Sequence, residues 1–203
     1  MSRYRGPRLR IVRRLGKLPG LTLKSSNKLN PPGQHGSITG KKYSQFNIRL
    51  KEKQKLRFHY GITERQLLNY LKKARKKKGS SGIELLNILE MRLDNLVYRL
   101  GLSPTILSAK QLVTHGHILV NGHSVNIPSF LCIPSNVISI KNSNSSQTLV
   151  KKNIQDYNSK GIPSHLSFNP ERLEGKILSI VSRESIVLVI NELLVVEYFS
   201  RKL

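Results

Sequence analysis

Positive charge is concentrated in the first 80 residues of this chain, and this asymmetry limits what the chain can fold into and bind. Residues 1–80 contain 23 Lys and Arg against two carboxylates, Glu52 and Glu64, whereas residues 81–203 contain 12 against 9. Like charges repel one another in a compact fold, and a polyanion such as nucleic acid relieves that repulsion. The net charge of +24 in 203 residues therefore disfavours an enzyme of small neutral metabolites.

The rest of the composition bounds the architecture. Hydrophobic residues make up 38% of the chain, which is enough for a core in one or two domains. The single cysteine, Cys132, cannot form an internal disulfide or a paired metal knuckle, and we expect an ordinary buried thiol. No apolar run approaches the roughly 18 residues that span a bilayer, so we expect no membrane partner.

The first 42 residues read as a basic arm. Gly and Pro interrupt its cations, and we predict that it does not fold alone but orders on an RNA phosphate backbone. An organelle transit peptide has a similar composition, but the basic excess continues to Lys78, so we treat the arm as mature protein. The candidate phosphate ligands of the arm are Arg3, Arg5, Arg8, Arg10, Arg13 and Arg14.

A small helical domain is predicted after the arm. Thr63 and Gln66 have the spacing of a capping box, which opens a helix. Cations at the end of that helix exceed what its dipole requires, so we predict a surface that faces phosphates. Its members are Lys72, Lys73, Arg75, Lys76 and Lys77.

A helix–helix–hairpin unit follows. Apolar residues step by three and four over residues 86–100, which predicts one helix with a buried face that Gly101 closes. Ser103-Pro104 marks the start of a second helix, and Asn121-Gly122 is the strongest short signal for a β-hairpin turn.

A polar stripe accompanies the first of these helices. Arg92, Asn95 and Arg99 fall at i, i+3 and i+7, so we expect them to lie beside the apolar face. Arg side chains can fork onto phosphates, and amides can bond ribose or bases. The candidate RNA ligands of this unit are Arg92, Asn95, Arg99, Lys110 and Gln111, followed by His117 and Asn121. Asn121 is explained equally well as a turn residue, and His117 as a solvent-facing side chain.

Several of these motifs resemble the family of small-subunit ribosomal protein S4. Residues 91–101, 108–113, 115–117 and 120–122 closely resemble the S4 RNA-binding module, in which two helices and a hairpin form one RNA-facing surface. Segments outside the module, such as Pro32-Gly33-Gln34-His35-Gly36, also look like the ribosomal protein. The resemblance spans almost the whole chain and is loose between about Asn142 and Ser167.

The resemblance implies a structural constituent of the small ribosomal subunit that binds ribosomal RNA directly, nucleates assembly of the subunit body and influences translational accuracy. The implied partners are small-subunit ribosomal RNA, a neighbouring protein of the S5 family, and messenger RNA near Lys41 and Lys42. No cofactor and no homo-oligomer are expected. Some members bind zinc through cysteines in the arm, but this arm has none, so no metal is expected. The Asn/Ser-rich stretch at 142–146 is similar to the plastid branch, which implies a chloroplast ribosome in the stroma, with a bacterial cytoplasm as the alternative.

The predicted fold is therefore α+β, with four parts along the chain. They are a basic arm at 1–42, a helical rRNA-binding domain at 43–88, the S4-type module at 89–152, and C-terminal strands at 153–203 that pack on the module and the helical domain.

Two other classes of protein carry the same module. A ribosome-associated factor of the stalled-ribosome rescue type has it, but lacks the long arm. Pseudouridine synthases also have it, and their catalytic aspartate occurs in a triplet like Arg92-Leu93-Asp94. Here the triplet lies inside the module and too few residues follow for a catalytic domain. We therefore predict no enzyme, and we assign Asp94 a structural or solvent-facing role.

Overall fold

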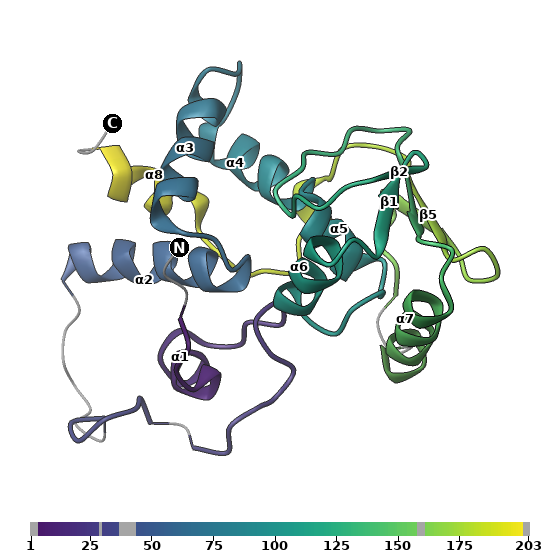
Figure 1. Cartoon of the computed structure of the whole chain (residues 1–203). Coiled ribbons are helices and arrows are strands. Elements are labelled where there is room, and N and C mark those ends of the chain that lie inside the picture. Colours follow the sequence, from purple (N-terminus) through teal and green to yellow (C-terminus); the bar gives the residue numbers. More distant parts are fainter. Residues whose placement is uncertain (1–3, 29, 37–43, 158–160, 201–203) are drawn as a thin grey trace. The chain divides into compact units, whose positions relative to one another are not determined.

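The chain divides into two compact units in the computed structural model, which describes residues 4–28, 30–36, 44–157 and 161–200. The first unit comprises residues 1–85 and 188–203, and the second comprises residues 86–187; Figure 1 follows the chain through both. The C-terminal part that the sequence treats as one piece is thus divided between the two units. The candidate ligands Arg3, Lys41 and Lys42 lie outside the described residues.

The first unit is helical in the part that the structure describes. Its elements are α1 (Arg8–Leu15), α2 (Gln45–His59), α3 (Glu64–Arg75), the start of α4 (Ser81–Glu90) and α8 (Glu192–Ser200). Helix α8 packs against α2, where Arg49 Nε donates a hydrogen bond to Glu197 Oε2 at 2.7 Å. The predicted strands near the C-terminus are wrong at this point, because residues 192–200 are helical.

Side-chain caps begin α2 and α3. Ser44 Oγ accepts a hydrogen bond from the backbone N–H of Asn47. Thr63 Oγ1 accepts from the N–H of Gln66, and Gln66 Oε1 accepts from the N–H of Thr63. These reciprocal bonds satisfy two donors that a helix start leaves open, and the capping box predicted at Thr63 is confirmed.

The basic arm contains a folded segment. Residues 8–15 form α1, which packs against α2, and Ile11, Leu15 and Leu18 are buried. This stretch is therefore ordered against α2 without RNA, so the prediction that it orders on an RNA backbone is wrong here, while folding of the arm by itself is not tested. Ile11 and Leu15 lie four residues apart on one buried face of α1, and Leu18 is buried just after the helix ends.

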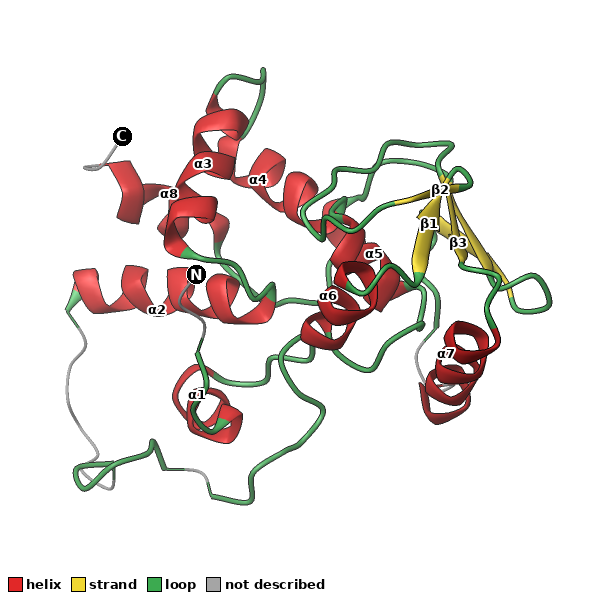
Figure 2. Cartoon of the chain, viewed as in Figure 1, coloured by secondary structure: helices red, strands yellow, loops and turns green. Residues whose placement is uncertain are grey.

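The second unit combines helices with an antiparallel sheet, and the mixed α and β class is confirmed. The strand order is β2-β1-β3-β5-β4, as Figure 2 shows in part. The elements are α5 (Leu93–Arg99), α6 (Ile106–Thr114), β1 (Ile118–Val120), β2 (His123–Ser124), β3 (Val137–Ile140), α7 (Asn144–Tyr157), β4 (Leu166–Asn169), β5 (Glu174–Ile177) and a 3₁₀ turn at Arg183–Ser185.

The predicted hairpin is confirmed at its turn. Asn121 and Gly122 have φ values of 50° and 81°, the left-handed conformations that a tight hairpin turn requires. Asn121 Oδ1 also accepts a hydrogen bond from the N–H of Val137 at 2.8 Å. Asn121 therefore forms the turn and ties the hairpin to β3.

The helix predicted over residues 86–100 is wrong as one continuous helix. It is interrupted between α4 and α5, where Arg92 is extended with φ −73° and ψ 142° and pairs with Leu131 as an isolated antiparallel bridge. The N–H groups of Leu93 and Asp94 donate to the carbonyls of Phe130 and Pro128. A distant loop thus takes two N–H groups that a continuous helix would bond internally.

The second helix of the module starts later than predicted. Thr105 caps α6 by accepting the N–H of Ser108, whereas the hydroxyl of Ser103 donates to the carbonyl of Thr105. The predicted cap at Ser103 is therefore wrong by two residues.

Candidate nucleic-acid interface

The cations predicted at the end of α3 all lie on the surface. Helix α3 buries Leu67, Leu71 and Ala74 and exposes the opposite side. The exposed cations are Lys72, Lys73, Arg75, Lys76 and Lys77. Lys77 Nζ also lies 2.9 Å from Glu84 Oε2, so this position is paired within the unit.

Carboxylates of the first unit already have cationic partners within it. Four ion pairs connect Lys55 to Glu52, Lys53 to Glu64, Lys77 to Glu84 and Arg49 to Glu197. The whole unit contains only one further carboxylate, Glu192. Internal pairing therefore leaves most of the positive charge of this unit uncompensated, which favours an anionic partner.

The arginines of the arm differ in their surroundings. Arg5, Arg10 and Arg14 are exposed. Arg8 Nη1 donates to the carbonyl of Leu21 at 3.4 Å, and Arg13 Nε donates to a carbonyl of the segment after the helix at 3.0 Å. Arg8 and Arg13 thus also hold the arm together, while the other three have their side chains in solvent.

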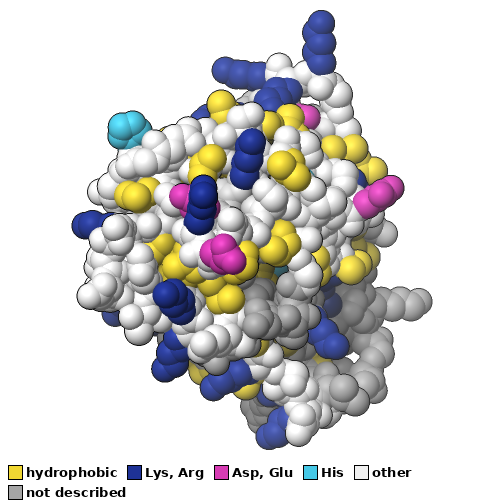
Figure 3. Space-filling model, turned by 90° about the vertical axis from the view of Figure 1, so that its right-hand side faces the viewer, with side chains coloured by type: hydrophobic (Ala, Val, Ile, Leu, Met, Phe, Trp, Pro, Cys, Tyr) yellow, Lys and Arg dark blue, Asp and Glu magenta, His cyan; other side chains and the backbone are white. Residues whose placement is uncertain are grey.

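The second unit offers a smaller polar surface on α6 and the hairpin. Gln111 and Asn121 are exposed, and Lys110 Nζ lies 3.6 Å from Asp94 Oδ2. Burial lowers the pKa of Lys110. The negative charge of Asp94 raises this pKa in part, and the positive charge of Arg92 lowers it further. Figure 3 shows Lys and Arg side chains standing out on one face of the molecule, with hydrophobic side chains between them.

His117 has a local partner rather than a purely solvent-facing ring. Its Nδ1 lies 2.9 Å from the Oγ of Ser146, a buried residue of α7. This contact connects the residue just before β1 to α7 and fixes the orientation of the imidazole.

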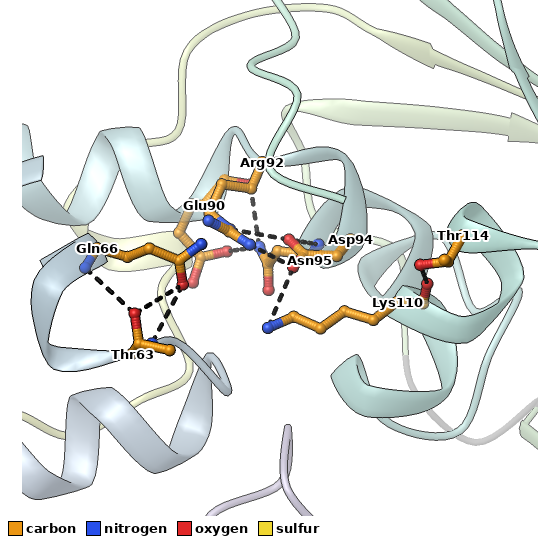
Figure 4. A network of polar contacts seen from close by, with 8 residues as sticks. All are labelled: Thr63, Gln66, Glu90, Arg92, Asp94, Asn95, Lys110 and Thr114. Atoms are coloured by element: carbon orange, nitrogen blue, oxygen red, sulfur yellow. Dashed lines mark hydrogen bonds and ion pairs between the residues drawn. The ribbon is translucent and has the colours of Figure 1, made fainter. Parts of the chain in front are cut away.

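Arg92, Asn95 and Arg99 do not form an exposed stripe. Arg92 and Asn95 are 1% and 0% exposed, and the Arg99 side chain is 8% exposed. The three side chains instead belong to a buried network with Glu90 and Asp94, of which Figure 4 shows the part around Arg92 and Asn95. The expectation that Arg92, Asn95 and Arg99 lie open to phosphates is therefore wrong.

Two forked arginine–carboxylate pairs make up this network. Arg92 donates through Nε and Nη2 to the two oxygens of Asp94, at 3.0 and 2.6 Å. Arg99 donates through Nε and Nη2 to the two oxygens of Glu90, at 3.0 and 2.7 Å. Asn95 joins the pairs, because its N–H donates to Asp94 and its side-chain amide donates to Glu90. Buried charges require this degree of pairing.

Sequence spacing gave no signal for Glu90 and Asp94 as partners. On one straight helix, Arg92 and Asp94 would point in different directions, because residues two apart do not share a face. The interruption at Arg92 brings them together. Glu90 and Arg99 are nine residues apart and lie on either side of the same interruption.

Asp94 and Cys132 are both buried in the second unit. Asp94 is fully buried against two cations, which agrees with the structural role assigned to it. Burial raises the pKa of the Cys132 thiol to about 12, so it stays protonated and unreactive near neutral pH.

In the part of the chain that is described, no group of three His, Cys, Asp or Glu could hold a metal ion, and no helix is long and apolar enough to cross a membrane.

Comparison with known proteins matches both units to ribosomal families. Residues 3–90 match the family model for the ribosomal protein S4/S9 N-terminal domain, and residues 91–138 match the S4 domain. The chain is 60% identical over its full length to small ribosomal subunit protein uS4c of Euglena gracilis, and 58% identical to uS4c of Lopidium concinnum. It is also 58% identical to uS4 of Nostoc punctiforme; in all three cases 100% of both chains is covered.

These matches and the fold define the class: a ribosomal protein with an RNA-binding module. Within this class, the chain belongs to the small ribosomal subunit protein uS4 family, as the full-length identities show. This is a family of structural ribosomal proteins that bind ribosomal RNA, and not a family of enzymes. The family resemblance inferred from the sequence is thereby confirmed, and a free factor carrying only the module is disfavoured.

Neutralising Glu90 should destabilise the second unit. In the Glu90→Gln variant, Arg99 keeps its buried position but loses its counter-charge, which we expect to cost about 3 kcal/mol. Native-state hydrogen exchange of the α5 and β3 amides measures this loss. The control is Glu171→Gln, an exposed change in the same unit that should cost less than about 0.5 kcal/mol. Equal effects of the two variants would contradict a structural role of the network.

Acid should also weaken the second unit through His165. This residue is 3% exposed; burial lowers its pKa, Glu90 opposes that shift and Arg99 adds to it. The unfolded chain then binds more protons than the folded one. The free energy of unfolding therefore falls as the pH drops through about 6.5, the pKa of an unfolded His, toward the lower pKa of His165 in the folded chain. Thermal unfolding from pH 7.5 to 5 measures how steeply the stability falls with pH. The His165→Leu variant should reduce this dependence, whereas the exposed control His123→Leu should leave it unchanged.

Proposed function

We propose that this chain is a primary binder of small-subunit ribosomal RNA, which uses a cationic surface on the first unit and a smaller polar surface on the second, and thereby nucleates assembly of the subunit body. The observation that carries the proposal is the uncompensated charge of the first unit, whose carboxylates are largely taken up by internal ion pairs. Phosphates are the natural counter-charge for such a surface. The second unit adds Lys110 and Gln111 of α6, together with the hairpin turn at Asn121, as its RNA-facing residues.

The buried residues of the module have a different role in this proposal. Arg92, Asn95 and Arg99 position α5. Arg92 and Asn95 also hold Asp94, which in turn lies 3.6 Å from Lys110 Nζ. They act on RNA binding by keeping α6 in position rather than by touching phosphates themselves.

Two surfaces on one chain also favour binding to folded RNA. Once one unit is bound, the other meets its own site at a high effective concentration. An RNA junction in which several helices meet offers such paired sites. Holding it would fix the fold of the RNA early in assembly.

The proposal also includes the type of ribosome and the neighbouring partners. The chloroplast-type names of the Euglena and Lopidium relatives support a plastid ribosome in the stroma, and the Nostoc relative supports a bacterial ribosome as the alternative. A neighbouring protein of the S5 family and messenger RNA near Lys41 and Lys42 remain predictions.

Removing the α3 cations should weaken RNA binding and flatten its dependence on salt. With about 6 to 10 phosphates contacted, the affinity of the unchanged chain for protein-free small-subunit rRNA should fall about 10³- to 10⁵-fold between 50 and 200 mM salt. The variant Lys72→Gln, Lys73→Gln, Arg75→Gln and Lys76→Gln should reduce the slope of log affinity against log salt by about 3. Filter binding across a salt series measures both.

A matched control removes four exposed cations from the second unit. The variant Lys151→Gln, Lys152→Gln, Arg172→Gln and Lys176→Gln lowers the net charge equally at positions outside the proposed surfaces. It should keep the steep slope. An equal flattening in both variants would show that only net charge matters, and a flat slope in the unchanged chain would overturn the proposal.

A further inference from the structure

The motif Pro32-Gly33-Gln34-His35-Gly36 forms part of a hollow in the first unit. The hollow measures about 1120 Å³ and lies among α1, the segment 30–36 and α2. Arg13 of α1 ties this segment down by donating to the carbonyls of Asn30 and Pro31, at 3.0 and 3.4 Å. The motif is thus a wall held against the cationic helix.

One stripe of α2 forms the opposite side. Asn47, Lys51, Gln54 and Phe58 line the hollow at intervals of four, three and four residues, the spacing of a single helical face. Gln54 Oε1 accepts a hydrogen bond from Arg57, so its amide NH₂ serves as a donor toward a ligand. This side therefore presents amides and an aromatic ring as well as charge.

The lining is cationic and carries no carboxylate among its described residues. Arg10 and Arg14 come from α1, and Lys51 and Arg57 come from α2. Arg10 and Arg14 both line the hollow and are exposed, so a ligand that enters from solvent can reach them. The site thus selects for an anionic ligand.

Part of the lining of the hollow is apolar or aromatic. Ile11, Leu15 and Leu50 contribute to the lining. The Phe58 ring meets Tyr4 edge-on at a centroid distance of 5.8 Å, and Arg57 lies over the same ring at 5.3 Å. A phosphate alone gains nothing from such a floor, whereas a nucleobase can stack on aromatic rings and guanidinium planes.

We propose that this hollow takes a single unpaired nucleotide of the bound RNA, with its base inside and its phosphate between Arg10 and Arg14. This inference rests on the proposed RNA-binding function and names the feature of the RNA that the first unit selects. At about 1120 Å³ the hollow exceeds what a phosphate alone requires, and a base that is stacked and paired within a duplex is not available to enter it. Asn47, Gln34 and Gln54 supply the amide groups that bond base edges.

Two RNA hairpins test the proposal with the full chain. They share one stem sequence, and one of them carries a single unpaired 2-aminopurine nucleotide. We expect the unpaired hairpin to bind at least about tenfold more tightly, since stacking of one base is worth that much. We also expect quenching of the 2-aminopurine fluorescence on binding.

The double variant Asn47→Leu, Gln54→Leu removes amides without changing charge. Its preference for the unpaired hairpin should shrink, because the bonds to the base edge are lost while stacking on Phe58 remains, whereas Asn69→Leu, an exposed change on α3, should keep the full preference. Thermal unfolding of both variants checks that the helices are intact. An undiminished preference in a folded double variant would overturn the inference.

The proposal and the function that it rests on fail in different ways. Equal, salt-sensitive binding of both hairpins by the unchanged chain would overturn the nucleotide site and leave the phosphate-binding surfaces standing. Failure to bind either hairpin or protein-free ribosomal RNA would overturn the proposed function.

Discussion

The buried pairing of Glu90 with Arg99 and of Asp94 with Arg92 is the interaction on which the second unit depends. Four charges lie in the interior, and each carboxylate has a forked partner at hydrogen-bond distance. Loss of one member would leave a buried charge uncompensated, a cost comparable to much of the stability of a small domain. The network also fixes the interruption between α4 and α5, and so the direction in which α5 leads into α6.

The first unit, by contrast, carries a large excess of positive charge. Its cations far outnumber its carboxylates, and most of its described ion pairs connect different parts of the unit, as Arg49 and Glu197 join α2 to α8. Many of the remaining cations stay on the surface, among them those of α1 and of the end of α3. The same charge distribution therefore supports the helices internally and leaves the surface dependent on an anionic partner, which is consistent with membership of a ribosomal family.

Local signals predicted local structure well. The Thr63 capping box and the Asn121-Gly122 turn were both found where the sequence placed them, because each depends on residues at most three positions apart. Family motifs identified the ribosomal relationship for the same reason, since they are read directly from adjacent residues. The exposed cations of α3 were also predicted, because Lys and Arg are rarely buried without a partner.

The sequence by itself determined the charge asymmetry, the helix start at Thr63, the hairpin turn and the RNA-binding class. Only the tertiary structure decided that Arg92, Asn95 and Arg99 are buried, because a loop near residue 130 takes the N–H groups of Leu93 and Asp94 and ends the helix periodicity from which exposure was inferred. It also decided that the arm folds in part, since the burial of Ile11 and Leu15 requires α2 as a partner. Contacts between residues far apart in the chain carry no local pattern, so only the folded chain reveals which charges face RNA and which face each other.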